Sequence, residues 1–256
     1  MDPAPRQPSL FSQITVQHGP AGLLGRVFLK CQAPFHELGI TLEFATLNDL
    51  VDVNRANRDS WAPLWSGFDP SFSLLTPANS FCILGRDRQA RVVVTQAARF
   101  LDWPHTNYRD EAESLRLMYA HPGTQKQPGE RCEVSALAAK GITGRIVYSG
   151  AAWCHPDYRG RRLTELLPRF SRSLAYTRWE SDCTVTMMAE PVVRGGVLQR
   201  SGHKNIEWEI RMFNSRGLIP RFALLWTKRA EMLEDLQEFL GGAAVSREAV
   251  RRVANA

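Results

Sequence analysis

Residues 144–179 constrain the fold more than any other part of the 256-residue chain. Residues 144–154 are largely apolar on both faces, which predicts a long central strand. A polar turn and a loop rich in glycine and arginine follow, and apolar residues then recur at helical spacing from Leu163 to about Trp179. This order of strand, loop and amphipathic helix predicts a sheet with a helix packed on it.

Strands and helices are expected on both sides of this unit. A helix capped by Asn48 or Asp49 should reach about Trp61, and residues 80–85 and 91–95 predict a hairpin. Because strands and helices mix around one sheet, the fold class is α/β (α+β) with antiparallel parts. The other expected elements are a strand at 40–44, a helix at 109–119, a strand at 183–188, a helix at 192–200, strands at 206–213 and 221–228, and a helix at 229–240.

The chain is expected to divide into three parts. Residues 1–38 are rich in Pro, Gln and Gly and show no sustained period, so they are interpreted as an N-terminal extension. Residues 39–228 form the predicted domain, interrupted by an insertion at 100–135. Residues 229–256 supply a C-terminal helix and tail, and the apolar stripe of that helix should pack on the domain or on a second copy in a homodimer.

The composition excludes several protein classes. With 44% hydrophobic and 23% charged residues, the chain is neither collagen-like nor disordered, and no run of 18 apolar residues predicts a membrane span. No secretory signal is visible, and the five cysteines include no Cys-x-x-Cys pair. We therefore expect a cytoplasmic protein with no membrane partner, no disulfide framework and no metal site.

The net charge of +6 comes from 32 basic residues, of which five are Lys and 27 are Arg. The excess of arginine reflects either the base composition of the source genome or an anionic partner such as nucleic acid, a phosphorylated cofactor or an acidic protein. The basic residues do not alternate with aromatic ones and form no known nucleic-acid module, so a nucleic-acid partner is not expected.

The loop before the central helix is the candidate phosphate site. Free backbone N–H groups and the helix dipole favour a phosphate at a helix start, and guanidinium groups pair with phosphate oxygens. The alternative is an exposed basic loop with no ligand. Thr164 is the predicted N-cap, which places Pro168 in the first turn, where proline is tolerated. The candidate ligand-binding residues are Trp153, Cys154, Arg159, Gly160, Arg161, Arg162, Leu163 and Thr164.

The segment His-Pro-Asp-Tyr-Arg-Gly-Arg-Arg-Leu at 155–163 resembles the acyl-CoA-binding motif of the GCN5-related N-acetyltransferases. Residues 196–203 are similar to the helix that ends in Gly-Phe in that family, and the element order matches from about residue 39 to 228. The resemblance implies a mixed, mostly antiparallel central sheet flanked by helices, with splayed fourth and fifth strands. It also implies that acetyl-CoA or another acyl-CoA is the co-substrate.

The chain departs from the family at four positions. Arg162 and Thr164 stand where the family has two small residues, so Arg162 either supplies charge or blocks the phosphates. Tyr148 replaces the usual base Glu, and Leu198 replaces the Tyr that protonates the leaving thiolate. The catalytic candidates are therefore Tyr148, as a hydrogen-bonding group or a core residue, and Glu190, as a base at the end of the next strand.

The leading function is an acyl-CoA-dependent N-acyltransferase that transfers the acyl group directly to an unidentified small-molecule or peptide amine. Orientation of the reactants alone contributes about 7–11 kcal/mol to such a reaction, so the missing acid and base do not exclude catalysis. Two alternatives stay open. In the first alternative, the acyl donor is an acyl carrier protein, whose acidic surface would suit the arginine-rich chain. In the second, the chain is a non-catalytic acyl-CoA-binding sensor.

Overall fold

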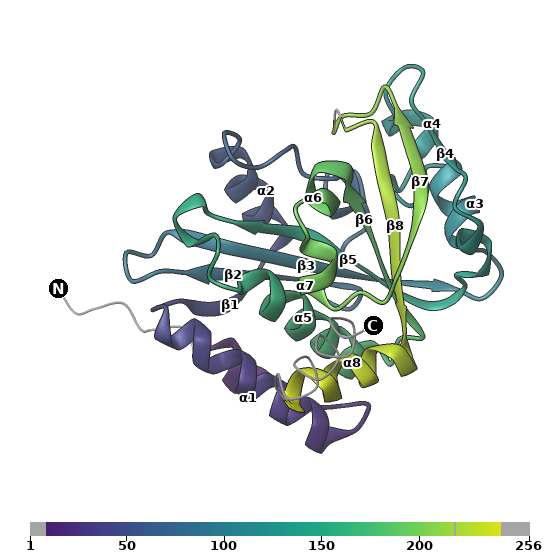
Figure 1. Cartoon of the computed structure of the whole chain (residues 1–256). Helices are drawn as coiled ribbons and strands as arrows, with labels where there is room; N and C mark the ends of the chain where they lie inside the picture. The colour runs from purple at the N-terminus through teal and green to yellow at the C-terminus, as the bar shows by residue number, and fades with distance from the viewer. Residues whose placement is uncertain (1–8, 218, 242–256) are drawn as a thin grey trace, which may run out of the picture.

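The computed structural model describes residues 9–217 and 219–241. Its centre is an eight-stranded sheet in the order β1-β2-β3-β5-β6-β8-β7-β4 (Figure 1), and only the β5–β6 pair is parallel. This confirms the predicted α/β class and the mixed, mostly antiparallel sheet. The strands are β1 (Thr41–Ala45), β2 (Ser80–Arg86), β3 (Val92–Trp103), β4 (Arg131–Val134), β5 (Gly144–Cys154), β6 (Cys183–Ala189), β7 (Asn205–Phe213) and β8 (Arg221–Lys228).

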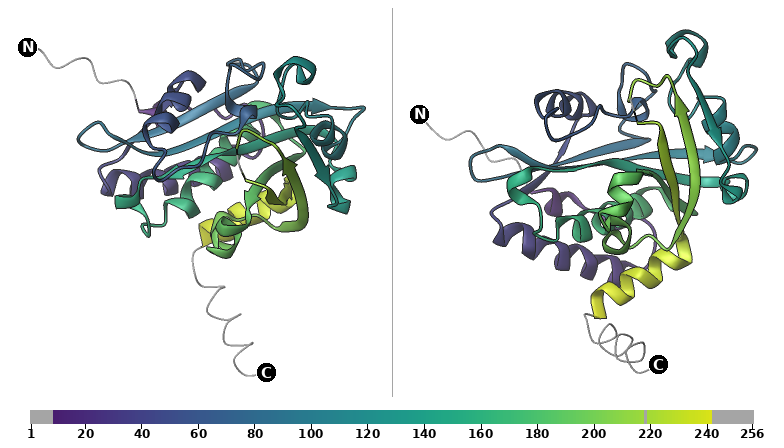
Figure 2. Two further views of the ribbon diagram at one scale, coloured as in Figure 1. Left: turned by 90° about the horizontal axis from the view of Figure 1, so that it is seen from above. Right: turned by 45° about the horizontal axis from the view of Figure 1, so that its top comes forward.

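Three helices cover one face of the sheet. Helices α1 (Ala21–Glu37), α5 (Leu163–Trp179) and α8 (Arg229–Gly241) pack on one another and, through α5, on β3 and β5 (Figures 1 and 2). The other face is covered by α2 (Leu47–Ala56), α3 (Tyr108–Glu113) and the loops around them. None of the described helices is long and apolar enough to cross a membrane.

The remaining helices are short. α4 (Pro122–Gln125) lies in the insertion, and α6 (Glu190–Arg194) and α7 (Val197–Ser201) follow β6. A single helix was expected at 192–200, but Gly195 and Gly196 separate two helices, because Gly196 has a left-handed backbone (φ +71°). Single turns of 3₁₀ helix occur at Leu10–Gln13, Ser66–Phe68, Leu137–Gly141 and Pro156–Tyr158.

Two predicted helix starts are wrong in detail. The N-cap of α2 is Thr46, whose hydroxyl accepts a hydrogen bond from the Asp49 N–H, while the Asp49 carboxylate accepts one from the Thr46 N–H. Asp49 is therefore the third residue of a capping box and not the cap. The N-cap of α5 is Arg162, so the helix begins at Leu163 and not after Thr164.

The segment at 1–38 contains a helix that the sequence analysis does not predict. Helix α1 buries Leu24, Val27, Cys31 and Phe35 in the core beneath the sheet. The insertion also adds regular structure, because β4 pairs with β7 and becomes an edge strand of the sheet. The described part of the N-terminal segment is therefore packed in the core.

Candidate functional site

β5 and β6 separate after a short parallel ladder. Their register runs from Ile146 opposite Cys183 to Tyr148 opposite Val185, and no residue of β5 beyond Tyr148 pairs with β6. We call the opening between residues 149–154 and 186–189 the notch. The backbone edge of β5 that faces the notch has no strand partner among the described residues, so its N–H groups are available to a ligand.

A β-bulge shapes β5 within the notch. The register with β3 shifts between Thr95 and Ala97, and Ala151 adopts φ +52°, which is rare for a residue with a side chain. The Thr95 hydroxyl donates to the Ala151 carbonyl at 2.7 Å and holds the bulge. Gly150 is required beside it, because a Cβ there would lie 2.7 Å from the Phe68 ring.

Tyr148 lies at the closed end of the notch. Its ring stacks on Trp65, with centroids 4.3 Å apart, and its hydroxyl oxygen accepts a hydrogen bond from the Met187 N–H at 3.2 Å. The O–H group of Tyr148 has no acceptor among the described residues. Burial raises the pKa of Tyr148 well above its ordinary value, so the side chain stays a neutral hydrogen-bond donor at physiological pH.

An apolar cavity of about 120 Å³ lies beside Tyr148, and none of its described lining residues is charged. A second cavity of about 30 Å³ shares Trp65, Met187, Gly217 and Phe222 with it. The sequence analysis named neither Trp65 nor Phe68 as a site residue, although the aromatic residues of this segment were a signal. The apolar cavity is lined by Pro63, Trp65, Phe68, Tyr148, Gly150, Ala151, Thr186, Met187, Gly217, Ile219 and Phe222.

The start of α5 opens toward solvent. Arg162 adopts φ +61°, so an arginine holds the left-handed conformation that glycine adopts without strain. Its side chain pairs with Glu165 at 2.8 Å. The backbone N–H groups of residues 161–164 have no acceptor in the described chain, as expected at a helix start. Thr164 is the second residue of the helix, and Leu163 is buried.

The other predicted ligand-binding residues lie around this helix start. Arg159 donates to the backbone carbonyls of Cys154 (3.3 Å) and Ser60 (3.2 Å), so it connects the end of β5 to the loop after α2. Arg161 is exposed and contacts the Tyr158 ring. Gly160 has φ +77° and open space where a Cβ would lie.

Trp153 and Cys154 end β5 and are less accessible than the arginines. The buried Trp153 stacks on Trp61, with centroids 5.3 Å apart, and its indole N–H donates to the Ser60 hydroxyl. Burial raises the pKa of the half-buried Cys154 thiol. The thiol is therefore protonated, and Cys154 is not an activated nucleophile.

Glu190 is the first residue of α6, at the carboxyl end of β6 as predicted. Its two carboxylate oxygens pair with Arg194 (2.5 Å) and Arg221 (3.2 Å). Glu190 is not among the residues that line either cavity. The structure therefore does not bring the two catalytic candidates, Tyr148 and Glu190, together at one cavity.

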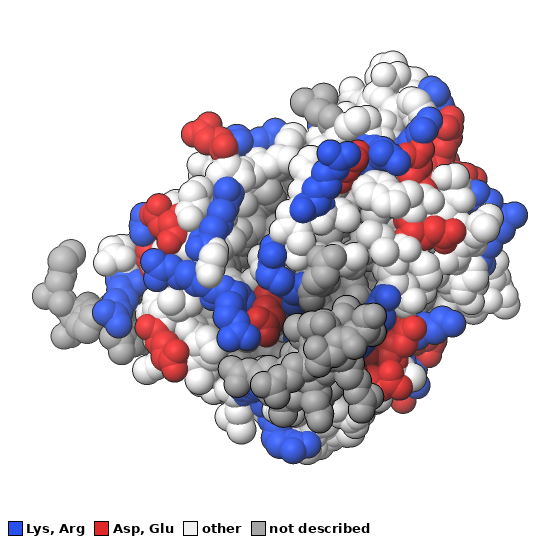
Figure 3. Space-filling model, in the orientation of Figure 1, with Lys and Arg blue, Asp and Glu red and all other residues white. Residues whose placement is uncertain are grey.

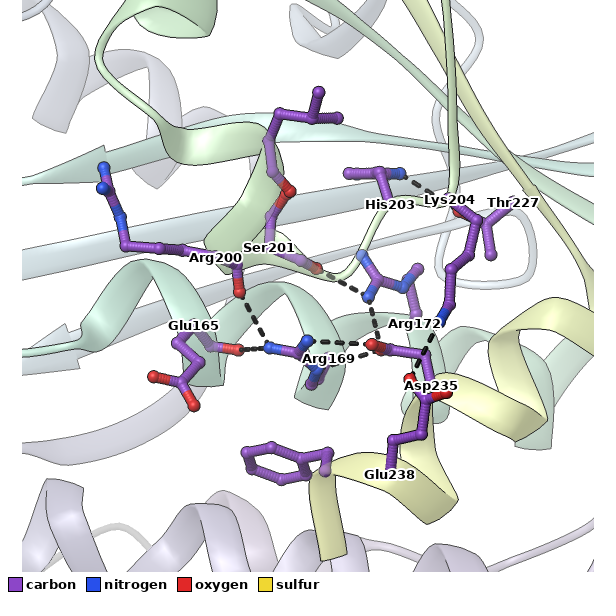
Figure 4. Close-up of polar contacts among 12 residues, drawn as sticks. Glu165, Arg169, Arg172, Arg200, Ser201, His203, Lys204, Thr227, Asp235 and Glu238 are labelled. Atoms are coloured by element: carbon purple, nitrogen blue, oxygen red, sulfur yellow. Dashed lines mark hydrogen bonds and ion pairs between the residues drawn. The ribbon is translucent and has the colours of Figure 1, made fainter. Parts of the chain in front are cut away.

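A buried ion cluster joins α5 to α7 and α8 (Figure 4). Asp235 of α8 accepts two hydrogen bonds from Arg169, at 2.8 and 2.9 Å, and pairs with Arg172 at 3.4 Å. Arg169 and Arg172 also donate to the Arg200 and Ser201 carbonyls at the end of α7. The sequence analysis did not identify this cluster, because its members lie 63 to 66 residues apart in sequence.

Basic side chains gather on the face that carries the start of α5 and helices α6 and α7 (Figure 3). The exposed arginines of these segments are Arg159, Arg161, Arg162, Arg194 and Arg200. Within residues 9–217 and 219–241, no group of three or more His, Cys, Asp or Glu side chains is arranged to hold a metal ion.

The chain was compared with known proteins. No protein-family model matches it, and no curated protein sequence matches it. Solved structures of acetyltransferases do match. One is the aminoglycoside acetyltransferase AAC(6')-Ib in complex with coenzyme A and kanamycin, at 11% identity, 76% coverage of this chain, 98% coverage of that chain and a TM-score of 0.44.

A second match is a structure of mutant forms of the spermidine/spermine N-acetyltransferase SpeG from Vibrio cholerae, at 9% identity, with 77% of this chain and 97% of that chain covered and a TM-score of 0.46. A third is a protein described provisionally as an acyl-CoA N-acyltransferase, from Klebsiella pneumoniae subsp. pneumoniae, at 12% identity, with coverages of 74% and 97% and a TM-score of 0.40.

Proposed function

We propose that this chain is a divergent GCN5-related N-acetyltransferase that transfers an acyl group, most simply acetyl, from acyl-CoA to an amine. The observation that carries the proposal is the notch. The parallel β5–β6 ladder stops after three residue pairs, and the chain leaves β5 for a loop whose free N–H groups open at the start of α5. This arrangement is the one expected from the sequence resemblance.

The residues at the start of α5 fit the phosphates of coenzyme A. The N–H groups of residues 161–164 and the helix dipole favour an anion, and the Arg161 guanidinium is not held by any carboxylate in the described chain. Arg162 pairs with Glu165, so its backbone N–H is better placed than its side chain to bind phosphate. The pantetheine arm would follow the unpaired edge of β5.

The chemistry is attack of an uncharged amine nitrogen on the thioester carbonyl carbon. The C–N bond forms, the C–S bond breaks, the amine loses a proton, and the thiolate leaves and is protonated to the free thiol of coenzyme A. Backbone N–H groups near Trp153 and Cys154 on the open edge of β5 would stabilise the developing oxyanion. Orientation in the notch contributes most of the remaining acceleration.

Tyr148 is the side chain best suited to assist this step. Its O–H has no acceptor among the described residues, and its ring lines the apolar cavity, so it would donate a hydrogen bond to the reacting group. Its raised pKa excludes a role as general base at neutral pH. Glu190 is a weaker candidate, because its carboxylate is held by two arginines.

A second candidate function is an acyl-CoA sensor without transferase activity. It is favoured by one observation, that neither a carboxylate nor an imidazole lines the apolar cavity among the described residues. The five exposed arginines also suit an acidic acyl carrier protein as donor in place of acyl-CoA. Donor and acceptor assays separate these three possibilities.

The test is thermal denaturation with and without acetyl-CoA. Ligand at a hundred times its Kd adds about 2.7 kcal/mol, and each kcal/mol raises Tm by about 2–4 °C in a chain of this size. We expect a rise of several degrees that is reduced in Arg161→Ala. Arg55→Ala, an exposed arginine of α2 outside the site, is the matched control and should keep the full shift.

No shift with any acyl-CoA would refute the binding site. Release of the coenzyme A thiol in the presence of an amine, followed with a thiol reagent, distinguishes the transferase from the sensor. The same assay with an acylated carrier protein as donor tests the carrier-protein variant. A shift without thiol release across an amine panel would favour the sensor.

A further inference from the structure

The apolar cavity beside Tyr148 has the size and the lining for one aromatic ring. Its volume of about 120 Å³ is close to that of an engineered apolar cavity of about 150 Å³ that binds benzene. Trp65, Phe68 and Phe222 supply aromatic walls, and Met187 supplies an adaptable thioether. A flat apolar group would therefore be surrounded by stacking and dispersion contacts.

The charge of the lining excludes a highly cationic ligand. Among the described residues, the apolar cavity has no carboxylate, and the second cavity contains one, Glu130. The Glu130 carboxylate already accepts hydrogen bonds from the Tyr119 hydroxyl and the Gln127 N–H, and Arg216 lines the same cavity. A polyamine would bring several charges into this space and find no unpaired carboxylate, which is unfavourable.

The same apolar lining compensates for the missing general base. Moving an ammonium group from water into an apolar site lowers its pKa and favours the uncharged amine, which is the nucleophile. The position where the family has a base Glu holds Tyr148, which cannot accept the proton at neutral pH. The ammonium group then loses its proton to solvent as the amine enters the cavity. An amine with one charge has to lose only one proton, whereas a polyamine would have to lose several.

Resting on the proposed transferase function, we propose that the acceptor is a primary amine carried on a single aromatic ring or an apolar group of similar size, and that it binds with this group against Trp65 and Met187. The acyl group is transferred to the nitrogen of this amine, and coenzyme A leaves as the free thiol. The acceptor is not a polycation.

Calorimetric titration tests the inference independently of turnover. The protein is saturated with coenzyme A, which carries no acyl group, and titrated with 2-phenylethylamine or spermidine. We expect 2-phenylethylamine to bind at least about tenfold more tightly. Equal or tighter binding of spermidine, or no heat from 2-phenylethylamine, would overturn the inference. Failure of acetyl-CoA to shift Tm would instead refute the proposed function.

Two pairs of variants locate the site. Trp65→Leu should weaken 2-phenylethylamine binding by about tenfold, because stacking contacts are lost. Trp61→Leu is matched to it, since Trp61 also stacks on an aromatic residue of β5 but lines neither cavity, and it should leave the preference between the two amines unchanged. An equal effect of both variants would overturn the assignment.

The second pair changes charge at nearly constant size. Met187 is half-buried and lines both cavities. Met187→Glu places a carboxylate at the cavity and should shift the preference toward spermidine by about tenfold relative to Met187→Gln, the uncharged control. If both variants keep the preference of the unmodified protein, the amine does not bind in this cavity.

Discussion

Removing the carboxylate of Asp235 should destabilise the whole chain. Asp235, Arg169 and Arg172 are 4%, 8% and 1% exposed, so the three charges are buried together. The loss of one partner of a buried ion pair costs about 3–5 kcal/mol, because the remaining charge has no compensation. Asp235→Ala leaves two buried guanidinium groups without a carboxylate, so we expect the free energy of unfolding to fall by about 3–5 kcal/mol and Tm by roughly 6–20 °C.

The assay is urea unfolding followed by tryptophan fluorescence, with thermal denaturation as a second measurement. Glu238→Ala is the matched control, because Glu238 lies one turn further along α8 and pairs with Lys204 at 2.9 Å on the surface. An exposed pair contributes at most about 1 kcal/mol. Asp235→Asn keeps the shape of the side chain, so its loss in the free energy of unfolding should lie between the losses of Asp235→Ala and Glu238→Ala. If Asp235→Ala costs no more than Glu238→Ala, the buried cluster does not stabilise the fold.

Three further predictions concern the site and its support. Tyr148→Phe should lower kcat by about 100-fold, as loss of one donor to the reacting group does, while Tm stays within a few degrees; an unchanged kcat would remove Tyr148 from the chemistry. Arg162→Gly should raise the free energy of unfolding by about 0.5–1 kcal/mol, because glycine adopts φ +61° without strain and the lost exposed ion pair with Glu165 contributes less than the strain that is relieved. A lower free energy of unfolding in this variant would contradict the prediction. The pKa of His203 is held well below its usual value, mainly by burial and also by Arg172, so the unfolded chain binds the proton more readily than the folded one. The free energy of unfolding should therefore fall as pH drops below about 6.5. Urea unfolding at about pH 5 and about pH 7.5 measures this fall, which should be smaller in His203→Gln.

Local patterns predicted the centre of the fold. The apolar stripe from Leu163 to Trp179 matches α5, and the run at 144–154 matches β5, because each pattern reflects burial of that segment itself. The closing strands β7 and β8 also lie where alternation placed them, within one residue. The fold class and the phosphate-binding loop candidate followed from these segments.

What could not be predicted depends on distant contacts. Residues 1–38 show no sustained apolar period, and Gly22, Gly25 and Pro34 lower the local helix propensity, so packing on α5 and α8 is what stabilises α1. The strand β4 is only four residues long, and pairing with β7 defines it. The stacking of Trp65 on Tyr148 likewise depends on the return of a loop over the sheet.

Gly202 shows how a position can be intolerant to substitution without contacting any ligand. It ends α7 with φ +74°, and a Cβ there would lie 2.4 Å from the Asp235 carboxylate and 2.7 Å from the Arg169 guanidinium. In a library of all twenty residues at position 202, we expect only glycine to survive selection for a folded chain. A genetic screen for inactive variants would therefore recover Gly202 and Asp235 together, although neither residue lines a cavity of the site.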